Sequence, residues 1–196
     1  MNTIVVFASG SGSNFQAIID AIENETLDAQ IAGLISSKKQ IQAIQRAKKS
    51  GIPVRVINPS DYRNPEEFGI ALLRQLHLWN PFLIVLAGYT VKVPDQVISE
   101  YRNQIINIHP SLLPKFGGRG YFGKKVHKAV LEAGEKISGC SVHFVDENYD
   151  EGPIIAQRQV PVLEEDTPDS LAERILDEEH KLLPEVIARL LSESDN

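Results

Sequence analysis

Apolar runs and amphipathic segments alternate along the first half of the chain. Short runs rich in aliphatic and β-branched residues predict buried strands at residues 3–7, 31–35, 54–57, 83–87 and 105–108. Between the first two runs, apolar residues from Phe15 to Ile22 follow the period of one helix face. Further helices are predicted over 41–49, with Gly51 just beyond the end, and over 65–78, with Pro65 in the first turn. This alternation predicts a parallel sheet covered by helices on both faces.

The pattern changes after Pro110. Two strand-like runs at 138–145 and 154–162 flank the polar loop 146–152, so they either pair antiparallel or extend the sheet. Thr167 followed by Pro168 is typical of a helix start, and a long final helix follows, with residues 192–196 expected to fray. The predicted fold is a single α/β domain over residues 1–196, with a mostly parallel, open, Rossmann-like sheet and antiparallel additions toward the C-terminus.

Composition narrows the class of protein. The 196 residues suffice for one domain with a sizeable core, and 42% hydrophobic and 23% charged residues are ordinary for a globular protein. A net charge of −6 argues against a general nucleic-acid surface. Cys140 is the single cysteine, which excludes a disulfide within the chain and suits a small buried hydrophobe. The first apolar run is short and lacks a basic leader, and none approaches the roughly 20 residues that span a bilayer. We therefore expect a cytoplasmic protein.

The segment 8–14 (Ala-Ser-Gly-Ser-Gly-Ser-Asn) connects the first strand to the first helix. Its glycines allow a sharp turn and close approach of a ligand, while the helix N-terminus offers unpaired N–H groups and a partial positive charge. Ser11, Ser13 and Asn14 add further donors. The glycine and lysine motifs of dinucleotide and nucleoside-triphosphate loops are missing, so the segment favours a monophosphate. A tight turn capped by Asn14 is the alternative interpretation.

Asn107 and His109 end the fifth predicted strand. Two positions apart on an extended chain, they point to the same side, at the carboxyl edge of the sheet where ligands usually bind. The amide can bond an oxyanion, and the imidazole can move a proton near neutral pH. The pair suits acyl transfer, and a structural role in closing the strand is the other open interpretation.

The segment 107–114 (Asn-Ile-His-Pro-Ser-Leu-Leu-Pro) resembles the signature of the folate-dependent formyltransferases. The resemblance covers nearly the whole chain. Residues 8–14 resemble the phosphate loop of the phosphoribosylglycinamide formyltransferases, and residues 86–89 resemble the strand end at their folate pocket. Residues 141–155 resemble their loop with an essential aspartate, and residues 178–180 resemble part of their last helix. It implies a Rossmann-like fold and formyl transfer from 10-formyltetrahydrofolate to the amine of phosphoribosyl-glycinamide, in purine biosynthesis. The implied partners are these small molecules, and neither nucleic acid nor a membrane is expected to bind. The active form would be a monomer or a homodimer.

The resemblance also implies roles for single residues. Asn107 would bind the formyl oxygen, His109 would shuttle the proton that lets N10 of the folate leave, and Asp150 would hold a water and keep His109 protonated. Without the resemblance, Asp150 is a turn residue. Glu179 would contact the glycinamide end of the substrate, and a solvated helix charge is the alternative. The substrate phosphate would be held by Gly12, Ser13 and Asn14. The folate would be bound by backbone near 146–150 and by Thr90, Val91, Lys92, Val93 and Asn107.

Residues 1–100 would thus form the phosphate-binding half, and residues 101–196 the folate-binding and catalytic half. Two segments depart from the family pattern: Val91 stands where relatives often carry a basic residue, which here follows as Lys92, and residues 150–153 read Asp-Glu-Gly-Pro rather than Asp-x-Gly-Gly. The segment 117–125 is longer than in many relatives. It is either a mobile loop over the substrate, with the phosphate near Arg119, Lys124 or Lys125, or a plain surface loop.

Other residues bear on cofactors and on competing functions. We expect the Leu113–Pro114 peptide bond to be cis, and we expect His143 to pack near the site or to bond a neighbour. No histidine has a zinc-like spacing with Cys140, so no metal is predicted. The competing functions are hydrolysis of formyl-folate, formylation of initiator methionyl-tRNA, and folate sensing without catalysis. Relatives with the first two activities carry an extra domain, whereas this sequence starts at the first strand and ends at Asn196. A sensor has no need of the proton-transfer residues.

Overall fold

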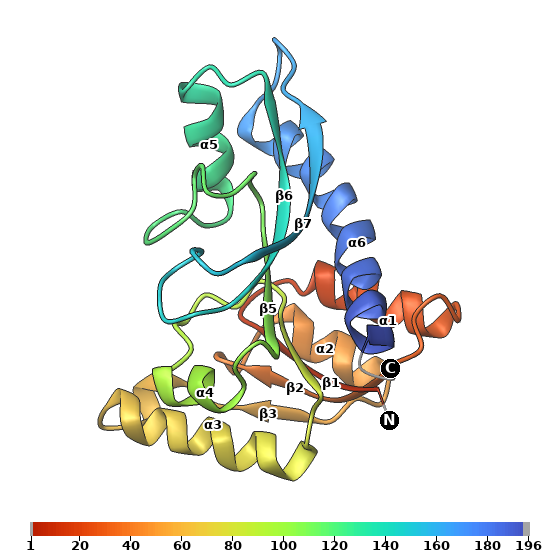
Figure 1. Ribbon diagram of the computed structural model, residues 1–196, viewed down its shortest axis with the longest axis vertical. Coiled ribbons are helices and arrows are strands. Elements are labelled where there is room, and N and C mark those ends of the chain that lie inside the picture. The colour runs from red at the N-terminus through yellow and green to blue at the C-terminus, as the bar shows by residue number, and fades with distance from the viewer. Residues whose placement is uncertain (1, 194–196) are drawn as a thin grey trace.

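A seven-stranded sheet runs through the computed structural model, which describes residues 2–193 (Figure 1). The strands are β1 (Thr3–Ala8), β2 (Gln30–Ser36), β3 (Val54–Val56), β4 (Leu83–Leu86), β5 (Ile105–His109), β6 (Ile137–Phe144) and β7 (Ile154–Pro161). Their order is β3-β2-β1-β4-β5-β6-β7. The first five strands are parallel, and β6 and β7 add antiparallel to the edge, which confirms the predicted fold class.

Within the described range, seven helical segments connect or follow the strands. They are α1 (Ser13–Glu23), α2 (Gln42–Lys49), the 3₁₀ helix η1 (Pro59–Asp61), α3 (Pro65–Trp79), α4 (Asp95–Glu100), α5 (Lys124–Glu132) and α6 (Pro168–Glu193). The sequence did not predict α4, because six residues are too few to show a helical period. Helix α6 continues through Glu193, so the expected fraying from Ser192 is wrong up to that point, and residues 194–196 lie outside the described range. Gly51 follows Ser50, the C-cap residue of α2, and has φ 67°, as predicted for a glycine at a helix C-terminus.

Alternate residues of the central strands point into two separate cores. Ile4 and Val6 of β1 belong to a cluster with α1, α2 and α6, whereas Val5 and Phe7 belong to a cluster with α3 and α4. All four side chains are buried, because a parallel central strand is covered on both faces. Helix α6 packs against α1, β6 and β7, so it joins the two ends of the chain (Figure 1). Helices therefore cover both faces of the sheet, as predicted.

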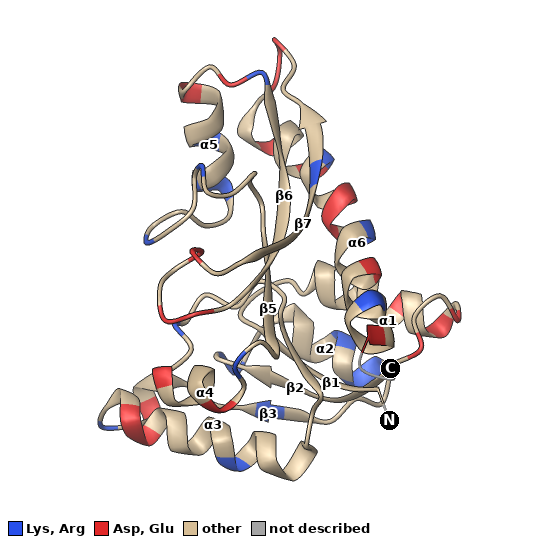
Figure 2. Ribbon diagram, in the orientation of Figure 1, with Lys and Arg blue, Asp and Glu red and all other residues tan. Residues whose placement is uncertain are grey.

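Charged side chains are dispersed over the molecule. Figure 2 shows Lys and Arg spread over several helices and interspersed with Asp and Glu on α6. Within residues 2–193, no helix is both long and apolar enough to cross a membrane. Cys140 is buried, and burial raises the pKa of its thiol to about 12, so it behaves as the predicted small hydrophobe.

Candidate active site

The loops that follow β1 and β4 meet at the point where the strand order reverses. From β1 the chain proceeds to β2 on one side, and from β4 it proceeds to β5 on the other. The backbone N–H of Ser9 donates to the carbonyl of Gly88 (3.1 Å), and the N–H of Thr90 donates to Oγ of Ser9 (3.0 Å). Open α/β sheets bind ligands in the crevice at such a switch point. The segment 8–14 therefore lies at the expected ligand position of this fold.

Gly12 allows the turn from this segment into α1. Its φ of 70° is left-handed, and an added Cβ would lie 2.7 Å from Cβ of Ala43 at the start of α2. Arg46 of α2 also holds the segment, because its Nε donates to the carbonyl of Ser11 (3.0 Å). The first N–H groups of a helix have no partner within the helix, so the start of α1 presents free donors beside a braced loop.

Asn14 and Glu179 form a buried pair between α1 and α6. Nδ2 of Asn14 donates to Oε2 of Glu179 (2.7 Å), and the two residues are 8% and 6% exposed. Two sequence interpretations are therefore wrong: Asn14 does not cap α1, whose N-cap residue is Gly12, and Glu179 is not a solvated helix charge. Burial raises the pKa of Glu179 to about 7, although the hydrogen bond from Asn14 opposes this.

A second cluster lies at the carboxyl end of β5. Asn107 and His109 come from this strand, and Asp150 comes from the loop between β6 and β7. Nε2 of His109 lies 3.4 Å from Oδ2 of Asp150. Asp150 also accepts from the N–H of Gly118 (2.9 Å) and has a left-handed φ of 58°. It is thus a turn residue, as the simpler interpretation held, and its carboxylate also faces the imidazole.

His143 connects Asn107 with Asp150. The antiparallel register places His143 of β6 opposite Asn107 of β5, and Nδ2 of Asn107 lies 3.1 Å from Nε2 of His143. The same ring nitrogen is 3.6 Å from Oδ1 of Asp150, while Nδ1 is 2.8 Å from the carbonyl of Phe144. His143 is therefore at the site and bonds its neighbours, as predicted. The sequence showed neither its partners nor this link, because both depend on strand register.

Burial and charge act in opposite directions on the two titrating groups. Burial lowers the pKa of His109, while the carboxylate of Asp150 and the carbonyl of Tyr121 raise it, and the net direction is down. Burial raises the pKa of Asp150, but His143, His109 and the N–H of Gly118 outweigh it, so that pKa lies below its ordinary value. The pair therefore combines an anionic carboxylate with an imidazole that releases its proton easily.

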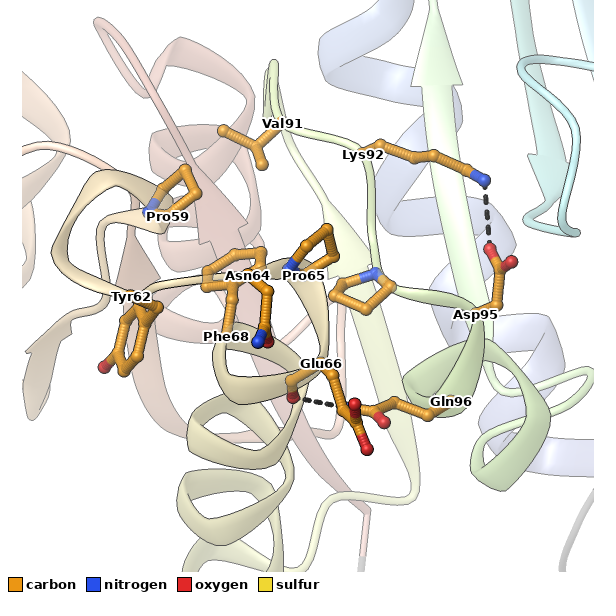
Figure 3. A pocket seen from close by; sticks show the side chains of 11 residues that line it. Pro59, Tyr62, Asn64, Pro65, Glu66, Phe68, Val91, Lys92, Asp95 and Gln96 are labelled. Carbon is orange, nitrogen blue, oxygen red and sulfur yellow. Dashed lines mark hydrogen bonds and ion pairs between the residues drawn. The ribbon is translucent and has the colours of Figure 1, made fainter.

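One cavity adjoins this cluster, and a second, larger cavity shares two of its lining residues. The smaller, about 70 Å³, is lined by Asn107, His143, Asp150, Val91, Lys92 and Val93 among others, so three of the four expected 90–93 residues line it and Thr90 does not. The larger, about 690 Å³, lies between the start of α3 and residues 91–96 (Figure 3). Val91 and Lys92 line both cavities. Nζ of Lys92 forms an ion pair with Asp95 (2.9 Å), so its charge is already partnered (Figure 3).

The segment 117–125 contacts His109 and Asp150. Besides the bond from Gly118 to Asp150, the carbonyl of Tyr121 lies 3.3 Å from Nε2 of His109. Lys124 and Lys125 begin α5 rather than belonging to a loop; Lys124 pairs with Asp169 (2.6 Å), and Lys125 lies over the ring of Phe122. The Leu113–Pro114 bond is cis, as predicted. Among residues 2–193, no group of three or more His, Cys, Asp or Glu is arranged to hold a metal ion.

The fold and these contacts define an α/β protein with an amide–imidazole–carboxylate cluster near the switch point of its sheet. The chain belongs to the formyl transferase family, whose sequence profile matches residues 2–187. The sequence is 44% identical over 191 residues to a chloroplastic phosphoribosylglycinamide formyltransferase of Vigna unguiculata, with 97% of this chain and 61% of the plant protein covered. The chain thus spans less than two thirds of that relative's length.

Bacterial relatives match over most of their own length. The phosphoribosylglycinamide formyltransferase of Bacillus subtilis (strain 168) is 43% identical over 191 residues, covering 97% of this chain and 95% of the relative. The crystal structure of glycinamide ribonucleotide transformylase 1 from Symbiobacterium toebii superposes with a TM-score of 0.92 at 40% identity, covering 98% and 88% of the two chains. A formyltetrahydrofolate deformylase from Pseudomonas syringae superposes with a TM-score of 0.88 at 26% identity, covering 98% of this chain and 62% of the other.

Proposed function

We propose that the chain transfers the formyl group of 10-formyltetrahydrofolate to the amine of phosphoribosyl-glycinamide, giving the N-formyl product and tetrahydrofolate in purine biosynthesis. The observation that carries the proposal is the cluster of Asn107, His109 and Asp150, two side chains from β5 and one from a distant loop, beside a cavity. The similarity to phosphoribosylglycinamide formyltransferases supports the choice of donor and acceptor.

In the proposed reaction, the substrate amine attacks the formyl carbon and the formyl oxygen gains negative charge. One N–H of the Asn107 amide is directed to His143. The second N–H of the same amide is therefore available to bind the formyl oxygen. When the tetrahedral intermediate collapses, the bond from carbon to N10 breaks and N10 takes a proton from Nε2 of His109. A water held by Asp150 relays the proton released by the amine to Nε2 of His109, which restores the ring, and the carboxylate favours the charged form of His109.

The phosphate of the acceptor is proposed to bind Gly12, Ser13 and Asn14. The free N–H groups at the start of α1 and the bracing of Ser11 by Arg46 support this assignment. Glu179 is proposed to contact the glycinamide part, and its hydrogen bond to Asn14 supports a position next to the phosphate loop. Residues 1–100 then supply the phosphate loop, while Glu179 reaches it from the other half.

The folate is proposed to lie against Thr90, Val91, Lys92 and Val93, with Asn107 and the backbone of 146–150 around its pteridine ring. The polar groups of the smaller cavity support this position. Its volume of about 70 Å³ corresponds to only about two water molecules. A bicyclic ring would therefore extend beyond this cavity. We further propose a monomer or homodimer in the cytoplasm, with small molecules as its only substrates.

The test is to incubate the protein with 10-formyltetrahydrofolate, with and without phosphoribosyl-glycinamide. Acceptor-dependent loss of formyl-folate, with one N-formyl product formed for each tetrahydrofolate, is the expected result. If formyl-folate were lost equally fast without the acceptor, the protein would be a deformylase. The superposition on the Pseudomonas syringae deformylase is the reason to test this alternative. Tight folate binding without turnover would identify a sensor, and either outcome would overturn the proposal.

A further inference from the structure

The hydrogen-bond partners of the His109 ring are incompatible with most of its protonation states. Nε2 faces the carbonyl of Tyr121 at 3.3 Å and the carboxylate of Asp150 at 3.4 Å. Both groups only accept hydrogen bonds, because Asp150 is ionised at neutral pH. Nε2 must therefore carry a proton. This leaves Nδ1, on the opposite side of the ring, to decide whether His109 is neutral or charged.

Nδ1 of His109 faces the hydroxyl of Ser111 at 3.0 Å. That hydroxyl donates its one proton to the carbonyl of Lys115, 2.7 Å away, and a carbonyl can only accept. While that bond is made, Oγ of Ser111 turns a lone pair toward the ring, and Nδ1 must also donate. A neutral ring would instead accept the hydroxyl proton at Nδ1, and the carbonyl of Lys115 would lose this hydrogen bond. Only the doubly protonated imidazolium satisfies all of these contacts together.

Ser111 is itself held in place by the neighbouring strand. It is fully buried, and its carbonyl accepts from Oγ of Ser141 (2.6 Å). Ser141 in turn accepts from the N–H of Leu113 (3.0 Å) and from Nε2 of Gln157 (2.8 Å). These bonds fix the backbone of the segment that follows His109, so the Ser111 hydroxyl is preorganised toward Nδ1 rather than free to follow the ring.

We propose that Ser111 is a positioning residue whose hydroxyl, anchored on the carbonyl of Lys115, stabilises the doubly protonated form of His109 against the burial that favours the neutral ring. Its catalytic consequence rests on the proposed function. When Nε2 gives its proton to N10, the ring keeps its proton on Nδ1, and the hydroxyl of Ser111 already accepts from that proton. The His109–Ser111 hydrogen bond therefore does not have to rearrange during proton transfer. The titrating groups that face the ring are Asp150, which favours the charge, and His143 and His127, which oppose it when protonated.

The test measures the pKa of His109 directly by ¹⁵N and ¹H NMR of histidine-labelled protein, assigned with His109→Gln. In Ser111→Ala the pKa is expected to fall by about one pH unit, the size of one lost hydrogen bond to a charged ring. Ser138→Ala is the matched control, because Ser138 is also buried, and its hydroxyl has no hydrogen-bond partner within residues 2–193. It should leave the pKa of His109 unchanged. Thermal unfolding verifies that both variants are folded.

Steady-state kinetics then tests the catalytic consequence. The alkaline limb of the pH profile of kcat is expected to move down by the same unit in Ser111→Ala, with KM for both substrates within about twofold of wild type. A folded Ser111→Ala protein with an unchanged or raised His109 pKa would overturn the proposal, and so would a lowered pKa with an unchanged kcat profile. If wild type transfers no formyl group, the proposed function fails, yet the NMR shift still decides whether Ser111 holds the charged ring.

Discussion

Replacing Asp150 with asparagine tests the charge coupling on which the proposed chemistry depends. Asp150 has a left-handed φ of 58°, a conformation that asparagine adopts more readily than most residues. The change keeps the size of the side chain and an oxygen that can accept from the N–H of Gly118. It removes the negative charge that lies 3.4 Å from Nε2 of His109 and turns the other carboxylate oxygen into an amide NH2. An effect on turnover can therefore be assigned to electrostatics rather than to a refolded loop.

The expected magnitude follows from this distance. Two unit charges 3.4 Å apart interact by about 5 kcal/mol at an effective dielectric constant of about 20. Desolvation reduces the net effect, and a single neighbouring charge shifts a pKa by about 1 to 3 units. The carboxylate favours the imidazolium, so Asp150→Asn is expected to lower the pKa of His109. Above that pKa, a step that needs the charged ring slows about 10- to 1000-fold, and the alkaline limb of the rate profile moves to lower pH.

The assay is the initial rate of formyl-folate loss from pH 5.5 to 9 at saturating acceptor, together with an NMR titration of His109. Glu151→Gln is the matched control, because it removes one negative charge from the adjacent, exposed position. It should change neither the profile nor the pKa. If the Asp150→Asn protein kept the wild-type pH profile and the wild-type His109 pKa, the carboxylate would have no part in proton transfer.

Three further perturbations probe other parts of the site. His109→Ala should lower kcat at least about 100-fold with substrate affinities retained, as calorimetry would show; near-normal turnover would remove the ring from the mechanism. Gly12→Ala should weaken binding of the phosphorylated acceptor and lower the melting temperature, because the added Cβ would lie 2.7 Å from Ala43; normal affinity would place the phosphate elsewhere. The pKa of Glu179 rises from the ordinary value of 4.5 to about 7 in the folded protein. Between these two pH values, the folded protein therefore binds more protons at Glu179 than the unfolded protein does. The free energy of unfolding should fall by about 3 kcal/mol as pH rises through this window. Denaturant unfolding of Glu179→Gln should lack this loss, and an identical pH dependence would refute the raised pKa.

The elements of the fold could largely be predicted from local patterns. Strand runs, the helix period and the Thr167–Pro168 start depend on neighbours in the chain, and the structure reproduces them with small shifts at their ends. Helix α4 was missed because one and a half turns contain too few apolar positions to show a period. The side-chain environment was harder to predict. Glu179 is indistinguishable in sequence from a surface glutamate, and only the packing of α6 on α1 makes it a buried partner of Asn14.

The sequence alone determined which functional groups the protein has and where they lie along the chain. These are a glycine–serine turn after the first strand, and an amide and an imidazole on one side of the fifth strand. These features are local, because strand periodicity and turn conformation involve residues a few positions apart. Tertiary structure alone decided which groups act on one another. The β5–β6 register sets His143 against Asn107, the β6–β7 loop brings Asp150 to His109, and the turn after β5 aims Ser111 at Nδ1. Burial and charge at a few ångströms set the pKa values there, and both depend on contacts between segments far apart in the chain.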